Sequence, residues 1–231
     1  MVTAELIVAE RWSVDSTYYA LNDKPTLLLG FDLHGQPIDS VAVRELIKQM
    51  AASGGNYLGL PTRDLSTTRV KDYLALSNEL GILVDTVGGK YDFRSMGSIA
   101  SFNAAVLAGQ PAVGYRQPVQ SALNSFRAIR TVERHLNFWD LRTDDRILGT
   151  SRPVGSLAAV DSLQNYLVYV AGNGAVQLNL LDSSQIARRV TVVGYLGTQR
   201  SEILYPPYDR SFTLQSNEER GGWMIIEPLA E

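Results

Sequence analysis

Short apolar runs alternate with longer amphipathic stretches over the first part of the chain. Residues 26–31 form an apolar run, residues 41–50 then repeat apolar side chains at helical spacing, and Gly54-Gly55 ends that stretch. The alternation returns, with runs at 57–60, 82–87 and 112–115 and helical stretches at 66–80, 98–108 and 121–136. Strands that alternate with helices of this length are typical of a parallel sheet covered by helices. We therefore predict an α/β layer over residues 1–136, which opens with a hairpin in residues 17–30.

After residue 136 the helical spacing stops and short runs rich in Val, Tyr, Ile and Thr follow one another. These runs lie at 157–160, 166–170, 176–180, 189–196, 212–214 and 223–226. Asn173-Gly174 stands between two of them and predicts a tight hairpin turn in which both residues have positive φ. Short strands joined by tight turns predict an all-β antiparallel β-sandwich over residues 137–231.

Composition narrows the function classes. Of the 231 residues 45% are hydrophobic and 19% are charged, which is an ordinary globular balance. The net charge is −3 and no strongly basic block occurs, so we expect no nucleic-acid partner. The chain has no cysteine and two histidines, His34 and His135, far apart in sequence, so we expect neither a metal site nor a cofactor.

The N-terminal sequence gives an expectation about location. The first ten residues lack a basic leader with a long apolar core, which argues against a signal peptide. No apolar run reaches the roughly 18–20 residues that span a bilayer, so we expect no membrane partner. The expected location is the cytoplasm by default, or outside the cell if a leader was removed.

The order of parts in the first region is similar to that of a known family. The run Thr26-Leu27-Leu28-Leu29-Gly30-Phe31-Asp32, then a helix and Gly55-Asn56-Tyr57-Leu58, resembles the start of barrel glycoside hydrolases. Residues 73–84 resemble the next unit of that barrel, and residues 122–136 with Phe138-Trp139 resemble its final helix. The resemblance implies a TIM-barrel-like fold and action on O-glycosidic bonds.

The C-terminal runs extend the resemblance, and the middle of the chain departs from it. Residues 166–170 to 223–226 resemble the C-terminal sandwich, labelled as collagen-binding, that these enzymes often carry. A closed barrel has eight strands and usually ~250 residues, whereas we predict only four strands here. No counterpart of the middle strands lies between residues 87 and 98, and Asn78-Glu79 falls inside a predicted helix. We therefore expect an incomplete (βα) TIM-barrel-like region followed by the sandwich.

Candidate site residues follow the predicted strands, because functional groups of parallel βα folds gather at the C-terminal strand ends. Asp32 and Asp85 are the candidate catalytic pair, since glycosidases need two carboxyl groups roughly 5 to 9.5 Å apart. The candidate substrate-binding residues are His34, Asp64, Asp92, Tyr115 and Arg116. The alternative is that Asp85 is held by hydrogen bonds within the sheet and that Asp32 only begins a loop.

Two main hypotheses of function stay open. The first is a reduced glycoside hydrolase that cleaves O-glycosidic bonds with its carboxylate pair. The second is a non-catalytic carbohydrate-binding or self-assembling structural protein derived from the same scaffold, which the missing middle strands favour. In both cases the open edges of an incomplete barrel predict a homo-oligomer.

Overall fold

The structure of the chain is a computed structural model that describes residues 12–14, 18–21, 24–37, 39–63, 65–89, 91–181, 186–205 and 211–229. Contacts divide the chain into two compact units. The first unit comprises Met1–Met96 and Pro111–Val119, and the second comprises Gly97–Gln110 and Gln120–Glu231. These units differ from the boundary at residues 136 and 137 that we expected from chain order, because residues 97–110 and 120–136 belong to the second unit.

A small antiparallel sheet opens the first unit. Its strands are β1 (Trp12–Val14), β2 (Tyr19–Leu21) and β3 (Lys24–Thr26), in the order β1-β2-β3. Tyr19 pairs with Thr26 across β2 and β3, as the expected hairpin requires. The expected turn residues Asn22 and Asp23 lie outside the described residues.

A parallel sheet forms the body of the first unit. Its strands are β4 (Leu28–Asp32), β5 (Tyr57–Gly59), β6 (Leu83–Asp85), β7 (Arg94–Met96) and β8 (Ala112–Tyr115), in the order β6-β5-β4-β8-β7. Every neighbouring pair is parallel. The sheet is therefore open within the described residues, with β6 and β7 at its edges. We expected four strands in this region, and β7 is the one that the sequence did not predict.

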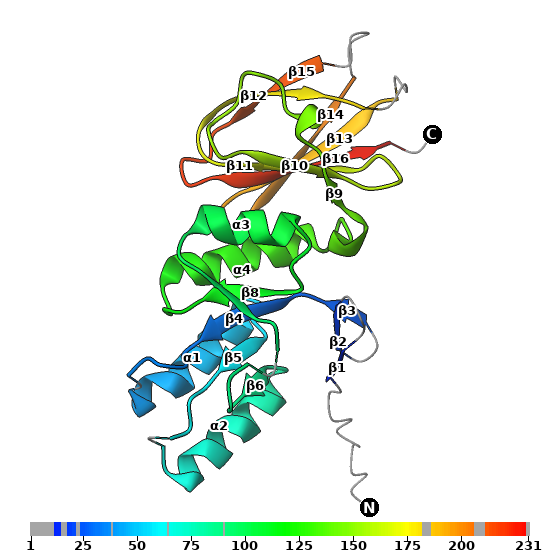
Figure 1. Ribbon diagram of the computed structural model, residues 1–231. Helices are drawn as coiled ribbons and strands as arrows, with labels where there is room; N and C mark the ends of the chain where they lie inside the picture. The colour runs from blue at the N-terminus through cyan, green and yellow to red at the C-terminus, as the bar shows by residue number, and fades with distance from the viewer. Residues whose placement is uncertain are drawn as a thin grey trace, which may run out of the picture. The chain divides into compact units, whose positions relative to one another are not determined.

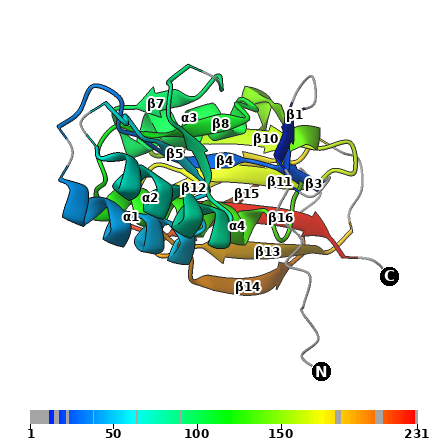
Figure 2. The ribbon, with the colours of Figure 1, turned by 90° about the horizontal axis from the view of Figure 1, so that it is seen from below.

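Two helices of the first unit lie side by side, α1 (Ser40–Ala52) and α2 (Thr67–Glu79), and α2 packs against β6 (Figures 1 and 2). The buried side chains of α1 recur at helical spacing, at Val43, Leu46, Ile47 and Met50. The side chain of Ser66 caps α2 by accepting a hydrogen bond from the Arg69 amide. Neither these helices nor the other described ones are long and apolar enough to cross a membrane.

The second unit combines two helices with antiparallel sheets. Its helices are α3 (Ile99–Leu107) and α4 (Gln120–Val132), and the single turns η1 (Phe138–Asp140) and η2 (Asp145–Ile147) follow. One sheet has the order β14-β13-β16-β11-β10-β9 and the other pairs β12 with β15. Their bounds are β9 (Arg142–Thr143), β10 (Leu157–Val160), β11 (Tyr166–Val170), β12 (Gly174–Asn179), β13 (Arg188–Val193), β14 (Gln199–Leu204), β15 (Ser211–Ser216) and β16 (Gly222–Pro228).

Both faces of the larger sheet are covered. On one face Val168, Val190 and Met224 share a core with Val176 and Leu214 of the smaller sheet. On the other face α3 packs against β10, and α4 packs against β13 and β16. Every residue of β11 is buried as a result. The second unit is thus antiparallel, as expected, but two helices cover a face that a two-sheet sandwich would leave to solvent.

The hairpin predicted at Asn173-Gly174 is wrong. The strands on either side of this dipeptide, β11 and β12, belong to different sheets. Gly174 begins β12, pairs with Ser216 and has a φ of 142°, whereas Asn173 is not among the residues with positive φ. The chain changes sheets here because β12 buries Val176 and Leu178 against the opposite sheet.

Candidate functional site

The register of the parallel sheet brings the two candidate carboxylates into one row. Asp32 at the end of β4 pairs with Gly59 of β5, and Gly59 pairs with Asp85 at the end of β6. In-register positions of neighbouring strands face the same side of a sheet, and the two Cα atoms are ~10 Å apart across two strand spacings. Gly59 carries no side chain between them. The sheet therefore places both carboxylates on one face at the C-terminal strand ends.

Tyr57 belongs to the same face and lies close to both carboxylates. Its hydroxyl donates to Asp85 Oδ2 at 3.5 Å. Burial raises the pKa of the Tyr57 phenol, and the nearby charges of Asp85 and Asp32 raise that pKa further. The phenol is thus held neutral between two acidic groups. The sequence signal that would have found it is the period of two residues along a strand, which puts Tyr57 and Gly59 on one face.

Aromatic rings pack around Tyr57. Its ring stacks on Phe93 with centroids 4.1 Å apart, and Tyr91 meets it edge-on at 6.0 Å. Tyr19 meets Tyr91 edge-on in turn, at 5.7 Å. The backbone amide of Asp92 donates to the Tyr19 hydroxyl at 3.2 Å. These aromatic side chains therefore form a packed cluster around Tyr57, with the edge-on and offset ring pairs that are common in protein cores.

Asp85 is almost fully engaged by its own loop. Only 1% of the residue is exposed. Its Oδ1 accepts hydrogen bonds from the backbone amides of Val87 at 3.1 Å and of Gly88 at 2.9 Å. With Tyr57 on Oδ2, the carboxylate shapes the turn that follows β6. Both amide donors belong to the loop after β6, whereas the structural alternative expected hydrogen bonds within the sheet.

Asp32 pairs with His34. Asp32 Oδ1 lies 2.7 Å from His34 Nδ1 and also accepts the His34 backbone amide at 3.1 Å. A Cβ at Gly59 would meet Asp32 Oδ1 at 2.5 Å and His34 Nδ1 at 2.9 Å, so only glycine leaves room for this pair. A Cβ at Gly88 would lie 3.4 Å from His34 Nε2. The imidazole is therefore oriented by Asp32 and enclosed by two glycines, and its buried Nε2 has no hydrogen-bond partner among the described residues.

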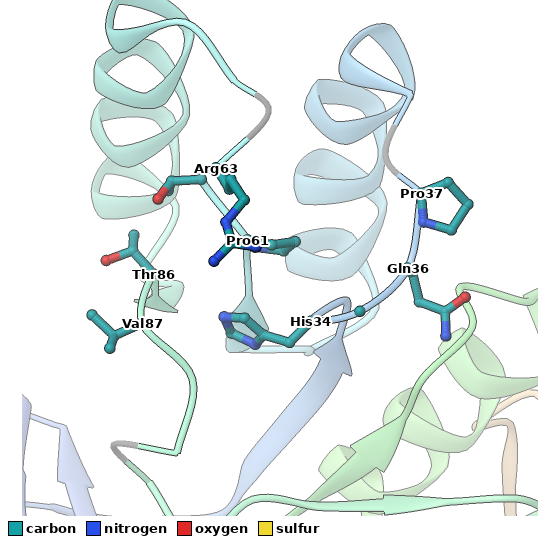
Figure 3. A pocket seen from close by; sticks show the side chains of 9 residues that line it. His34, Gln36, Pro37, Pro61, Arg63, Thr86 and Val87 are labelled. Atoms are coloured by element: carbon teal, nitrogen blue, oxygen red, sulfur yellow. The ribbon is translucent and has the colours of Figure 1, made fainter.

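An open cavity of about 770 Å³ lies over the loops that follow β4, β5 and β6. Figure 3 shows His34 and Arg63 between the loop that carries Thr86 and Val87 and the loop that carries Gln36 and Pro37. Gly35, Pro61 and Thr62 complete the lining. Among the described residues that line this cavity none is acidic.

The remaining candidates are spread around the sheet. Tyr115 is buried at the end of β8 and, by alternation along the sheet, faces the side opposite Asp32. Arg116 follows it and is exposed, and Asp92 is exposed in the loop before β7. Asp64 lies outside the described residues. Of the seven candidates, the structure brings Asp32, His34 and Asp85 together, and it holds no group of three or more metal-binding side chains in its described part.

The buried side-chain amide of Asn56 links the two strands that carry Asp32 and Gly59. Asn56 Oδ1 accepts the Leu29 backbone amide at 2.8 Å, and Asn56 Nδ2 donates to the Leu27 carbonyl at 3.0 Å. The side chain thus bridges the start of β5 to β4. The Gly55-Asn56-Tyr57-Leu58 stretch that carries the family resemblance therefore has a structural role in aligning Tyr57 and Gly59 with Asp32.

Two solved structures share the fold of nearly the whole chain. One is described as a glycoside hydrolase, with a TM-score of 0.65 and 8% identity over 96% of this chain and 97% of the other. The second is described as a glycoside hydrolase family 5 protein from Bacteroides vulgatus, with a TM-score of 0.66 and 8% identity over 96% of this chain and 94% of the other. At such identities the likeness shows the fold and leaves the reaction open.

No family model and no curated protein matches the chain. The narrower resemblance, to barrel enzymes with a collagen-binding type of C-terminal domain, stays a prediction. The two solved structures show the fold alone. The chain has a glycoside hydrolase-like fold that combines a parallel βα sheet with antiparallel sheets.

Proposed function

We propose that the chain is a carbohydrate-binding protein on a glycoside hydrolase-like scaffold, with its binding site at the C-terminal ends of β4, β5 and β6. One observation carries the proposal. The cavity at these strand ends is open and is lined by amide, hydroxyl, imidazole and guanidinium groups, whereas the described lining holds no carboxylate. Neutral and cationic donors beside the apolar rings of Pro37 and Pro61 suit the hydroxyls and the ring faces of a sugar.

The engagement of the two carboxylates supports binding without hydrolysis. A glycosidase needs one carboxyl group that can protonate the leaving oxygen and another that can reach the anomeric carbon or its water. Asp85 is 1% exposed and already accepts hydrogen bonds from two amides. Asp32 is committed to His34. Neither Asp32 nor Asp85 is among the residues that line the cavity.

The experiment compares binding with turnover. We expect isothermal titration with neutral oligosaccharides to show binding that weakens about tenfold in Arg63→Ala, which removes one charged donor. Lys48→Ala is the matched control, because Lys48 is a cation on the same unit that pairs with Glu45 outside the cavity. A panel of chromogenic glycosides should release no product. Unchanged affinity in Arg63→Ala would place the binding elsewhere.

Hydrolysis of O-glycosidic bonds by Asp32 and Asp85 is the second candidate. The observation that favours it is the shared row, with both carboxylates on one face at the C-terminal strand ends. If the loop of residues 86–88 moved, Asp85 would lose its amide donors and could act as an acid. Activity on a chromogenic glycoside that disappears in both Asp32→Asn and Asp85→Asn would support this candidate over the first.

A further inference from the structure

The strand β14 forms one edge of the six-stranded sheet in the part of the chain that the structure describes, and it pairs there with β13 alone. It has six residues and no proline, and its first five residues are exposed. The opposite edge of the same sheet, β9, has only two residues. A long edge strand presents a row of backbone donors and acceptors that can pair with another chain.

The hairpin turn before β14 fixes which of its backbone groups point outward. The Gly194 amide donates to the Thr198 carbonyl at 2.8 Å, so that carbonyl points toward β13. Along an antiparallel strand the backbone groups of successive residues point alternately to either side. The groups that point away from β13 are therefore those of Gln199, Ser201 and Ile203. Ser201 is the middle one of the three.

Opposite charges stand on either side of Ser201, at Arg200 and Glu202. Both residues are exposed, and neither side chain makes a hydrogen bond or an ion pair within the described part of the chain. Charges on an edge strand usually prevent pairing with another copy, because like charges that face each other are destabilising. The spacing of these two charges makes the outcome depend on register.

Three two-fold axes through the middle of β14 can be compared. An axis at Arg200 sets this arginine against its own copy, and an axis at Glu202 does the same with the glutamate, so both place like charges opposite each other. An axis at Ser201 instead sets Arg200 opposite Glu202 of the second copy, and the symmetry repeats this pair. The charges therefore favour one register of self-pairing and disfavour its two neighbours.

The backbone favours the same axis. With the axis at Ser201 this residue faces its own copy, and Gln199 faces Ile203 of the second copy, so the outward groups of all three residues exchange hydrogen bonds. Arg200 and Glu202 then occupy the non-hydrogen-bonded positions. Opposed side chains are closest there, with Cα atoms ~4.5 Å apart.

We propose that β14 pairs antiparallel with β14 of a second copy about a two-fold axis at Ser201, so that the chain dimerises by joining its six-stranded sheet to that of the second copy. The centre of the interface is small and already satisfied, because Ser201 Oγ lies 2.8 Å from Thr191 Oγ1 of its own sheet. Ile203, which is 56% exposed, becomes partly covered. This edge belongs to the second unit, and the proposal is independent of the carbohydrate site and of the open edges at β6 and β7.

The first test reverses the charges in the full chain. Glu202→Arg and Arg200→Glu each set like charges opposite each other at both symmetric positions, so we expect the dimer dissociation constant from analytical ultracentrifugation to rise about tenfold or more. The double variant Arg200→Glu/Glu202→Arg restores opposite charges in the same register and should regain the affinity of the parent. Glu79→Arg is the matched control, because it makes the same change of net charge at an exposed position of α2.

A second test reads the register directly and uses the absence of cysteine from the chain. In an equimolar mixture of Arg200→Cys and Glu202→Cys, a mixed dimer sets the two cysteines opposite each other and keeps one ion pair. Their Cα separation of ~4.5 Å lies within the roughly 4.4–6.8 Å that a disulfide spans. In either variant alone the cysteines are diagonal neighbours, roughly 7–8 Å apart, which is too far. We therefore expect a disulfide-linked dimer on non-reducing electrophoresis from the mixture and not from either variant alone.

Four results would overturn the proposal. They are a parent protein that stays monomeric at high micromolar concentration, a single charge reversal that dimerises like the parent, a double variant that stays dissociated, and single cysteine variants that crosslink as readily as the mixture. Dissociation by Glu79→Arg to the same extent as by Glu202→Arg would also overturn it, because net charge and not pairing at β14 would then control the dimer.

Discussion

Asp85 is the residue whose replacement separates a structural carboxylate from a catalytic one. Its Oδ1 accepts the amides of Val87 and Gly88, and 1% of the residue is exposed. A hydrogen bond to a charged group contributes about 1.5 kcal/mol at the lower end of the usual range. Asp85→Ala removes two of them, so we expect the free energy of unfolding of the first unit to fall by about 3 kcal/mol.

Asp85→Asn keeps an acceptor at Oδ1 but loses the charge, and its amide nitrogen can no longer accept a hydrogen bond from the Tyr57 hydroxyl. The same two bonds then weaken by about half, so we expect a fall of about 1.5 kcal/mol from them. Urea denaturation followed by far-ultraviolet circular dichroism measures both changes, and hydrogen exchange at the Val87 and Gly88 amides reports the local opening. Asp92→Ala is the control, since the recorded hydrogen bond of Asp92 comes from its backbone amide. Stability of Asp85→Ala within about 0.5 kcal/mol of the parent would refute the structural role, because such a small effect is typical of surface changes.

Three further predictions concern charge and assembly. The pKa of the Tyr57 phenol is raised above 10.0 by burial and by Asp85, so its contribution to stability is complete below pH 10 and is lost as the pH rises further. Tyr57→Phe should therefore make the loss of stability at alkaline pH shallower. An unchanged alkaline stability profile would contradict this prediction. Arg146 lowers the pKa of Asp144 to about 2, so the contribution of that pair is present above pH 3.8 and lost as the pH falls toward 2. Arg146→Ala should return the carboxyl titration seen by NMR toward 3.8, and a value still near 2 would rule Arg146 out as the cause. The open edges at β6 and β7 predict a homo-oligomer with an interface above ~1,000 Å², and a stable 25.4 kDa monomer in light scattering at micromolar concentration would contradict it.

The parallel sheet could be predicted from sequence because its strands are short apolar runs between glycine-terminated helices. Four of its five strands follow that rule. The strand β7 does not, since Arg94-Ser95-Met96 is three residues long and includes an exposed arginine. Its place beside β8 is set by pairing in space, which no periodicity along the chain reveals.

The attachment of the helices could not be predicted in the same way. A buried helix pattern shows that a face is covered but does not say which sheet covers it. On α4 the buried side chains include Leu123, Phe126 and Ile129, and this helix packs against β13 and β16 of the second unit. The hairpin predicted at Asn173-Gly174 was wrong for a related reason. A turn sequence predicts that the chain changes direction, but it does not predict which strand the next strand pairs with.

The strand-end positions of the candidate residues could be predicted from the sequence, whereas their hydrogen bonds could not. Asp32, His34 and Asp85 stand where the sequence places them, at strand ends. Their engagement depends on groups with no such signal, namely the amides of residues 87 and 88 and the space left by Gly59. A search for catalytic residue types does not detect backbone amide donors or the space left by a glycine. The sequence alone therefore suggested that both carboxylates were free for catalysis.

We propose that the chain binds carbohydrate at the ends of β4, β5 and β6 without cleaving it. A time series of proton NMR spectra of a neutral oligosaccharide mixed with the protein tests this directly, because saturation transfer from the protein reports binding and new anomeric signals report hydrolysis. We predict saturation transfer that is reduced in Arg63→Ala, and anomeric signals that do not change over the series. New reducing-end signals with the parent protein that are absent with Asp32→Asn and Asp85→Asn would contradict binding without cleavage and establish a glycosidase.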